Sequence, residues 1–334
     1  GNVGVGFNYG LRKNGYNPAL IPINPNLDTY PKYVQSVQES LQSAQFYDKN
    51  TPSICIYHQF ALNHFISNKR IGFPIFELNK FTDTEKHHLK SCDELITCSE
   101  WGKNVIANET GLNAHVVPLG VDTEVFTPKL STGNETKFLV VGKFELRKGM
   151  DILPSLFRKA FPNNENVILS VLGTNPFYSE KENKEWAVHF LKFNRTIILP
   201  YIQTQEDLCR LYQSIDYGVC ISRAEGWDLP LLEMMSAGKK SIVTNYSGHS
   251  EFATKDTSYL INAKELETAY DGRWFVSGIG EWLSLKDVED EIIETLRKMH
   301  KERQENGPKL YQNCITVAKQ HDWSEVAKQL IAVC

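Results

Sequence analysis

Short apolar runs rich in β-favouring residues alternate with helical segments along this 334-residue chain. This alternation is typical of parallel sheets covered by helices, because parallel neighbours need a crossover between them. The polar run 131–136 separates two such series, and we interpret it as a linker. The expected strands are 19–23, 53–57, 71–76, 94–97 and 115–119 in the first series, and 137–141, 167–173, 196–200, 217–221 and 241–244 in the second.

The composition is that of a soluble globular protein, with 41% hydrophobic and 23% charged residues. A net charge of −4 gives no basic footprint for nucleic acid or anionic lipid, and no apolar run approaches the length of a membrane span. We also expect no signal peptide. The seven cysteines are scattered without a Cys-x-x-Cys pair. We therefore expect neither a disulfide framework nor a zinc site, and a reducing cytoplasmic location.

The stretch 222–238 joins one apolar run to a helix through a polar turn. It reads Ser-Arg-Ala-Glu-Gly-Trp-Asp-Leu-Pro-Leu-Leu-Glu-Met-Met-Ser-Ala-Gly. Pro230 suits the first helical turn and Gly238 the position just past the helix end. We therefore expect Glu225 in the loop and Glu233 in the first turn of the helix. Free amides at a helix start bind anions and carboxylates bind hydroxyls, so a ligand with a diphosphate and several hydroxyls would use both.

This stretch resembles the Glu-Gly-Phe-Gly-Leu-Pro…Glu signature of retaining glycosyltransferases of the family 4 type, within glycosyl transferases group 1. Residues 117–122 (Val-Pro-Leu-Gly-Val-Asp) resemble the Pro-Asn/His-Gly-Val-Asp segment that leads out of the family's first domain. Residues 142–149 resemble its Gly-Arg…Lys-Gly segment, and 321–334 its last helix. The resemblance covers most of the chain. It implies an α/β architecture of the GT-B fold, in which two Rossmann-like domains face each other across a cleft.

The same resemblance implies the domain limits. Residues 1–124 would form an acceptor-side domain completed by the C-terminal helix 321–334, and residues 125–320 would form the nucleotide-sugar-binding domain. The family has a strand before its first glycine-rich loop. That strand and an initiator Met are missing here, so we expect the given chain to begin downstream of the native start.

Lys143 and Lys148 take the positions of the family's Arg and Lys in the Gly-Arg…Lys-Gly segment. Two cations at a strand end would stabilise negative charge on a departing nucleoside diphosphate. Lys in place of Arg keeps the charge but gives up bidentate geometry. Read without the family, both are solvated loop lysines. The resemblance makes Lys143, Lys148 and Glu225 the catalytic candidates, with Glu225 facing the transferred sugar and Arg147 as a spare cation.

Further residues are implied to hold the donor. Glu233 would accept hydrogen bonds from the ribose hydroxyls, the turn amides would lie near the diphosphate and sugar, and Ile202 would meet the base. The implied carrier is UDP or GDP, with no other cofactor. No clean Asp-x-Asp pair is present, so a bridging metal is not implied. The donor-binding candidates are Glu233, Gly226, Trp227, Asp228, Leu229, Ile202, Gly173 and Arg147.

Asp228 departs from the family, which prefers Gly at this position. A negative side chain beside an anion site can have two opposite effects on donor binding. It could bind a sugar hydroxyl and narrow donor choice, or it could weaken donor binding.

On the acceptor side, the candidates are Gly1, Gly4, His58 and Glu77. Gly1 and Gly4 would belong to a glycine loop that lets a ligand approach the backbone. His58 and Glu77 follow two expected strands, and ligands bind at the carboxyl ends of parallel strands. The alternatives are a flexible terminus, a hydrogen-bonded structural His and a solvated carboxylate.

Residues 264–283 read as an irregular surface insertion with two tryptophans, Trp274 and Trp282. Aromatic rings there could stack on a sugar or anchor the loop, and we favour the anchoring role.

Together these features predict an enzyme, a retaining hexosyltransferase. It would transfer a hexose-type sugar from a nucleotide-diphosphate donor to a hydroxyl of a glycan or another acceptor, without nucleic acid or a membrane span. Two alternatives remain: a non-catalytic two-lobed carbohydrate- or nucleotide-sugar-binding protein, and a GT-B epimerase or phosphorylase. The base, the sugar, the acceptor and the oligomeric state are not indicated.

Overall fold

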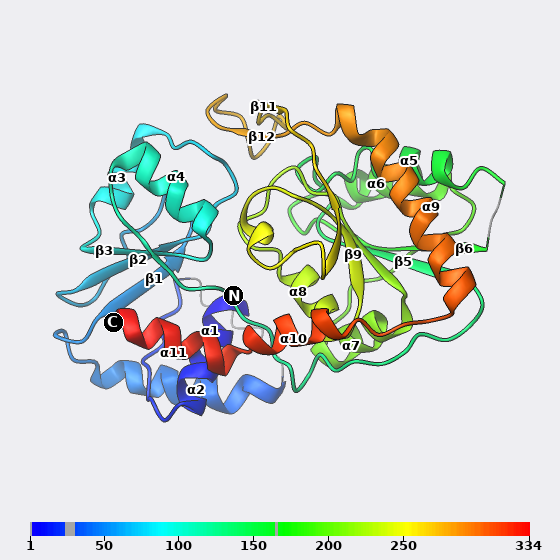
Figure 1. Cartoon of the computed structure of the whole chain (residues 1–334). Helices are drawn as coiled ribbons and strands as arrows, with labels where there is room; N and C mark the ends of the chain where they lie inside the picture. The colour runs from blue at the N-terminus through cyan, green and yellow to red at the C-terminus, as the bar shows by residue number, and fades with distance from the viewer. Residues whose placement is uncertain (1, 24–30, 164–165) are drawn as a thin grey trace. The chain divides into compact units, whose positions relative to one another are not determined.

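The computed structural model describes residues 2–23, 31–163 and 166–334 (Figure 1). It divides into two compact units. Unit 1 comprises Gly1–Asp122 and Lys319–Cys334, and unit 2 comprises Thr123–Ala318. From the sequence we expected the boundaries between the two domains after residues 124 and 320, two residues later than the structure has them. Each unit holds a parallel sheet covered by helices, so the α/β architecture predicted from the alternation is confirmed.

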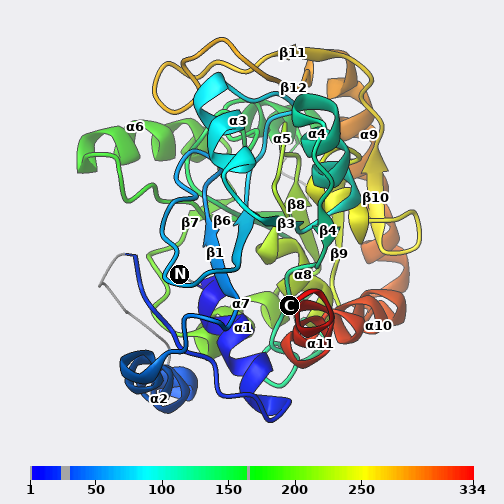
Figure 2. The same cartoon turned by 90° about the vertical axis from the view of Figure 1, so that its left-hand side faces the viewer.

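Within the described residues, unit 1 has a four-stranded parallel sheet in the order β1-β2-β3-β4. The expected strand 115–119 is shorter in the structure, because Pro118 has no N–H to donate. Helices α3 and α4 lie on one side of the sheet and α1, α2 and α11 on the other (Figures 1 and 2). The elements are β1 (Ser53–Tyr57), β2 (Arg70–Pro74), β3 (Glu94–Thr97), β4 (His115–Val116), α1 (Asn2–Lys13), α2 (Val34–Ser43), α3 (Asp83–Lys90), α4 (Glu100–Thr110) and α11 (Trp323–Val333), with short 3-10 helices at Pro31–Tyr33 and Ala44–Phe46.

The glycine-rich start of the chain is helical, so the expected glycine loop is wrong for Gly4, which lies inside α1. The reason is the packing of α1 against α11. A Cβ on Gly6 would lie 2.2 Å from Trp323 Cε2, and one on Gly10 would lie 2.1 Å from the Trp323 carbonyl oxygen. These glycines therefore let the two helices approach closely. Gly1 lies outside the described residues.

Residues 19–23 run as irregular backbone and not as the expected strand. Leu20 donates its N–H to the Ser40 carbonyl, which belongs to α2. Side chains of 19–23 line a cavity of about 980 Å³ together with Ile54 and Ile56 of β1. Ala19, Ile21 and Ile23 are exposed and the two residues between them are half-buried, so the β-favouring composition of this run does not by itself produce strand pairing.

Unit 2 has, in its described part, a six-stranded parallel sheet in the order β10-β9-β8-β5-β6-β7. The strands expected in this half of the chain are all present, with ends shifted by a few residues. Strand β7 stops before Pro200, because proline has no N–H to donate to a neighbouring strand. The strands of this sheet are β5 (Thr136–Val141), β6 (Val167–Leu172), β7 (Thr196–Ile198), β8 (Tyr217–Cys220), β9 (Lys240–Thr244) and β10 (Ser258–Ile261). A separate antiparallel pair, β11 (Leu266–Thr268) and β12 (Glu281–Leu283), lies within 264–283, so this segment is not irregular throughout as expected.

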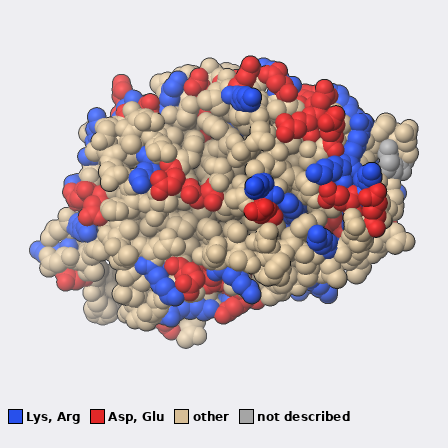
Figure 3. Space-filling model, in the orientation of Figure 1, with Lys and Arg blue, Asp and Glu red and all other residues tan. Residues whose placement is uncertain are grey.

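Helices α5, α6 and α9 share one apolar core with this sheet, centred on Phe138, Phe157 and Leu296. Helices α7, α8 and α10 lie on the other side (Figure 1). On the face drawn in Figure 3, acidic and basic side chains are interspersed and form no single-sign field. The helices are α5 (Leu153–Ala160), α6 (Glu180–Leu191), α7 (Gln205–Ser214), α8 (Leu229–Ser236), α9 (Glu289–Asn306) and α10 (Gln312–Gln320), with short 3-10 helices at Gly248–Glu251 and Lys286–Val288.

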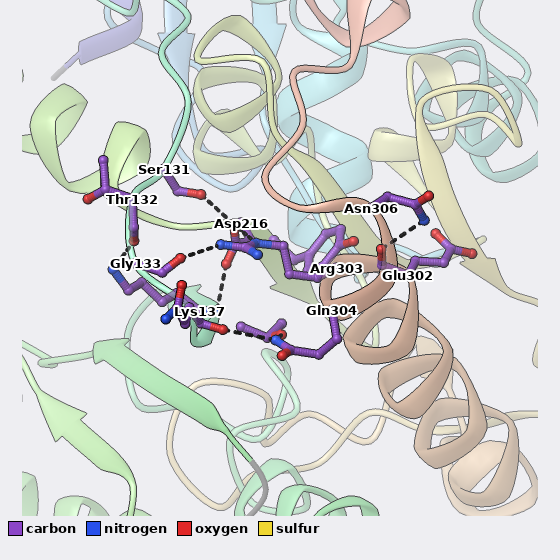
Figure 4. Close-up of polar contacts among 12 residues, drawn as sticks. Ser131, Thr132, Gly133, Lys137, Asp216, Glu302, Arg303, Gln304 and Asn306 are labelled. Carbon is purple, nitrogen blue, oxygen red and sulfur yellow. Dashed lines mark hydrogen bonds and ion pairs between the residues drawn. The ribbon is translucent and has the colours of Figure 1, made fainter.

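The polar run 131–136, which we interpreted as a linker, is held inside unit 2 (Figure 4). Asp216 at the start of β8 accepts hydrogen bonds from the Ser131 hydroxyl and from the N–H of Lys137, at 2.9 Å for the latter. Arg303 of α9 pairs with Asp216 at 2.7 Å and donates to the Gly133 carbonyl at 2.9 Å. Because the Asp216 and Arg303 side chains are almost fully buried, this ion pair fixes the run against the sheet and α9.

Candidate active site

The candidate site lies where the strand order of the parallel unit 2 sheet reverses. Strands β5 and β8 are neighbours, and the chain proceeds from β5 to β6 on one side and from β8 to β9 on the other. In such sheets the loops at the carboxyl ends separate at this point and leave room for a ligand. The two loops here are 142–149 after β5 and 221–228 after β8, which contain the matched segments.

Glu225 is buried and surrounded by donors. Lys148 Nζ lies 2.6 Å from its Oε1 and Arg147 Nη1 lies 2.8 Å from its Oε2. The Ser222 hydroxyl donates to Oε1 at 2.5 Å. Burial by itself would raise the pKa of Glu225, but the two cations reverse this effect and hold the pKa well below its ordinary value. Glu225 is therefore an ionised carboxylate in a fixed position.

Lys148 shares this environment. Burial by itself lowers the pKa of its ammonium, but the negative charges of Glu225 and Asp228 outweigh burial and leave the pKa raised. The ammonium is therefore charged, and its side chain is only 13% exposed. The structure thus brings together Lys148 and Glu225, which are far apart in the sequence.

Arg147 has a different position from the one expected of a spare cation. Besides Glu225, it contacts Glu145 at 3.2 Å and donates to the Ala224 carbonyl at 2.8 Å. These contacts connect the β5 loop to the β8 loop, so Arg147 acts as part of the framework.

Lys143 does not join the buried cluster. Its side chain is 47% exposed, and its ammonium lies 3.6 Å from Glu145 and 5.1 Å from the ring centre of Phe177. Glu145 also binds Arg147, so Lys143 is connected to Glu225 only through two intermediate side chains.

Asp228 adopts the left-handed conformation, with φ 78° and ψ 68°. Glycine takes this conformation at little cost, whereas other residues are strained by about 1–2 kcal/mol. This geometry gives a physical reason for the Gly that the family prefers here. The Asp228 side chain is buried, its Oδ2 lies 3.6 Å from His249 Nδ1, and its Oδ1 has no hydrogen-bond partner among the described residues.

The segment after β9 contacts the backbone of the turn that contains Glu225 and Gly226. Ser247 Oγ accepts the N–H of Glu225 at 2.8 Å, and Gly248 donates its N–H to the Glu225 carbonyl at 2.9 Å. A Cβ on Gly248 would lie 1.9 Å from the Gly226 carbonyl oxygen. Trp227 packs against Phe252 with ring centres 4.8 Å apart. Leu229 begins α8 next to this turn.

Glu233 is the fifth residue of α8, so its expected place in the first turn is wrong. The helix begins at Leu229, because the left-handed Asp228 cannot belong to it. Tyr212 of α7 donates its hydroxyl to Glu233 Oε2 at 2.9 Å. Burial raises the pKa of Glu233 to about 8 and the charge of Asp228 adds to this effect, although the Tyr212 hydrogen bond opposes it. Glu233 is therefore largely protonated at neutral pH.

Two other donor-side candidates lie at the carboxyl ends of β6 and β7. Gly173 follows β6, and a Cβ there would lie 2.8 Å from the Phe144 ring, so Gly173 allows the β5 loop to pack closely. Ile202 lies half-buried in the loop between β7 and α7.

In unit 1, His58 and Glu77 follow the neighbouring strands β1 and β2, so both lie at the same edge of that sheet. His58 is exposed and stacks on Phe60 with ring centres 5.3 Å apart. Glu77 is half-buried. Gly4 lies within α1.

The model of the family described as glycosyl transferases group 1 matches residues 121–299, which is more than half of the chain. The chain belongs to this family. It is 24% identical over 157 residues to the GDP-mannose:cellobiosyl-diphosphopolyprenol alpha-mannosyltransferase of Xanthomonas campestris, a match that covers 47% of this chain and 41% of that protein. It is 26% identical over 179 residues to the uncharacterized glycosyltransferase YqgM of Bacillus subtilis, covering 53% of this chain and 49% of that protein. The chain thus spans less than half the length of these curated relatives.

Solved structures extend the likeness to the whole chain. Sucrose-phosphate synthase from Thermosynechococcus elongatus superposes with a TM-score of 0.67 at 15% identity, covering 98% of this chain and 90% of that one. A glycosyltransferase from Rickettsia africae gives a TM-score of 0.65 at 14% identity, covering 99% and 93%. At this identity the likeness concerns the fold alone, and it shows the GT-B glycosyltransferase fold with two Rossmann-like domains, as the matched segments predicted.

Several residues of the candidate site were not predicted from the sequence. Ser222 directly follows an apolar strand, and from that position it could have been predicted to contact a ligand or Glu225. Tyr212 and His249 carried no such signal, because they reach Glu233 and Asp228 only through the packing of α7 and of the segment after β9.

Among the described helices, none is long and apolar enough to cross a membrane.

Proposed function

We propose that this glycosyltransferase transfers a hexose from a nucleoside-diphosphate donor to an acceptor hydroxyl, with retention at the anomeric carbon. The observation that carries the proposal is the contact of Lys148 with Glu225 at the switch point of the unit 2 sheet. A donor needs a cation for its diphosphate and a carboxylate for its sugar hydroxyls, and this contact holds both in fixed positions.

In this mechanism Glu225 accepts hydrogen bonds from the transferred sugar, while Lys148 and Lys143 stabilise the charge that develops on the leaving diphosphate. Lys143 is exposed, so its ammonium can turn toward a phosphate. The N–H groups at the start of α8 bind the diphosphate further. Attack on the same face of the sugar, assisted by the leaving phosphate, gives retention. The lysines supply the positive charge, so we propose a metal-independent reaction.

Glu233 holds the ribose in this proposal. In its protonated form the carboxyl can donate one hydrogen bond and accept others, which suits a pair of vicinal hydroxyls. His58 and Glu77 are proposed for the acceptor, because they share the carboxyl edge of the unit 1 sheet.

UDP and GDP remain the proposed carriers, and a glycan the proposed acceptor. The matched alpha-mannosyltransferase, whose name specifies GDP-mannose, supports GDP as the first carrier to test. We place the reaction in the cytoplasm, as the scattered cysteines suggest.

The test is a thermal-shift panel of UDP, GDP, ADP and CMP with and without EDTA, followed by transfer assays with the matching sugar nucleotides. A ligand that binds only the folded protein raises its apparent stability. We expect one diphosphate to raise the Tm in EDTA, and NMR of the product to show the anomeric configuration of the donor. Inversion of that configuration would remove the retaining mechanism, and a shift that requires a divalent cation would remove metal independence.

A non-catalytic binding protein is the second candidate, favoured by one observation. Asp228 places a buried carboxylate at the start of α8, where a diphosphate would bind. If this charge excludes the diphosphate, sugars will bind without turnover, and no nucleoside diphosphate will shift the Tm.

A further inference from the structure

Two exposed aromatic rings form a pair on the surface of unit 2. Phe177, in the segment between β6 and α6, is 57% exposed, and Trp274, in the insertion 264–283, is 43% exposed. Their ring centres lie 5.2 Å apart and the rings meet edge to face at 65°. Two large rings in contact thus expose apolar area side by side, unlike hydrophobic side chains that are scattered singly over a surface.

The insertion holds Trp274 in place before any ligand arrives. Asp271 Oδ1 accepts the N–H groups of Arg273, Trp274 and Phe275 at 2.8, 2.8 and 2.9 Å. Phe275 packs on Trp282 with ring centres 5.4 Å apart, and Trp282 is buried. The anchoring role that we favoured for both tryptophans therefore fits Trp282, whereas Trp274 faces solvent.

Arg273 fixes the insertion to the segment that carries Phe177. Its Nη1 lies 2.7 Å from Glu182 Oε1, and its Nη2 donates to the Phe177 carbonyl at 2.5 Å. The guanidinium also lies over the Tyr178 ring, 4.5 Å from its centre. The two aromatic rings thus come from segments far apart in the sequence but form one preorganised surface, and preorganisation lowers the entropy lost on binding.

This surface is continuous with the candidate site. The ammonium of Lys143, in the β5 loop, lies 5.1 Å from the centre of the Phe177 ring. A molecule lying on the aromatic pair would therefore also meet the loop that holds the proposed catalytic lysines.

We propose that Phe177 and Trp274 form a sugar-binding platform, on which the apolar C–H face of a pyranose of the acceptor glycan stacks. The inference rests on the proposed transferase function. A sugar ring presents an apolar face and a rim of hydroxyls, and this surface offers aromatic faces rimmed by Lys143, Arg273 and Glu182, which hydrogen-bond hydroxyls. The mixed charge of that rim suits a polyhydroxyl ligand better than a lipid tail.

The experiment is saturation-transfer-difference NMR of the whole chain with cellobiose, maltose and mannobiose at millimolar concentration. We expect saturation of the pyranose ring protons for at least one disaccharide. F177A and W274A should each weaken its binding about tenfold, and W274F should restore most of it. Tyr270, which is 60% exposed on the same insertion, supplies the matched control Y270A, which should bind as the wild type does.

The same variants are tested for a Tm shift by GDP and UDP and for sedimentation with phosphatidylcholine–phosphatidylglycerol vesicles. W274A should keep the nucleotide shift, because it leaves Lys148, Glu225 and the Phe177 ring under the Lys143 ammonium in place. Absence of disaccharide binding, unchanged binding in W274A, or vesicle binding that W274A abolishes would overturn the platform. Disaccharide binding lost in W274A, in a protein that no nucleoside diphosphate shifts, would support the platform and remove the transferase function instead.

Discussion

Lys148 Nζ contacts Glu225 Oε1 at 2.6 Å, and both side chains are largely buried. The pair is not symmetrical, because Glu225 is also bound by Arg147 whereas Lys148 has the carboxylates of Glu225 and Asp228 nearby. Removal of Glu225 takes the acceptor from Lys148, Arg147 and the Ser222 hydroxyl, although carboxylates remain near both cations. Removal of Lys148 leaves Glu225 with Arg147.

This asymmetry predicts different losses of stability. E225A should lower the free energy of unfolding by about 3–5 kcal/mol, because three buried donors lose their acceptor. K148A should lower it by less. Urea unfolding followed by circular dichroism measures both. Both variants should lose transferase activity, and an E225A protein as stable as K148A would contradict the assigned charge arrangement.

Asp228 provides a second prediction, since its strain and its charge can be separated. D228G removes both, and D228N removes the charge but keeps the left-handed residue. D228G should raise the free energy of unfolding by about 1 kcal/mol, and D228N should change it less.

Nucleotide titration of the same two variants tests the two readings of Asp228. If its carboxylate repels the diphosphate, both variants should bind GDP or UDP more tightly than the wild type. Unchanged nucleotide affinity, with loss of discrimination between donor sugars, would favour a hydroxyl-binding role.

The raised pKa of Glu233 predicts how the free energy of unfolding depends on pH. Its pKa is raised to about 8 in the folded state and is near 4.5 in the unfolded chain. Between these values the folded protein binds more protons than the unfolded one, so the stabilising contribution is complete below pH 4.5 and is lost as pH rises toward 8. E233Q cannot titrate, and its free energy of unfolding should fall less over this window. Parallel curves for the wild type and E233Q would refute the raised pKa.

Gly6 and Gly4 of α1 provide a matched pair of substitutions, one at a packed position and one at an open position. G6A should destabilise the protein, because the new Cβ would overlap the Trp323 ring. G4A should stabilise it by about 0.5–1 kcal/mol, since no described atom lies within 4 Å of that Cβ and Ala favours a helix. Thermal unfolding compares the two variants. A destabilised G4A would show that Gly4 has a role other than the one its place in α1 gives it.

The fold was predictable wherever the local pattern and the tertiary structure agree. Strands β1 and β3 have the limits expected from the sequence, since polar or turn residues bound their apolar runs. Residues 19–23 show the limit of that reasoning, because their apolar side chains line a cavity and remain largely exposed, without strand pairing.

The site was predictable in part. Resemblance placed Lys148 and Glu225 in one region, and the sheet order brings their loops together. It did not reveal that Arg147 is buried against Glu225, or that Glu233 is paired with Tyr212, because these contacts depend on side-chain packing across loops and helices.

The assembly of unit 1 from both ends of the chain bears on how the protein is made. Helix α11 supplies Trp323, against which the glycines of α1 pack, yet it is synthesised after unit 2. Domains usually fold as units in the order of their synthesis. Here unit 1 must wait for residues that follow unit 2 in the chain, so unit 2 can complete its sheet while unit 1 remains unfinished on the nascent chain.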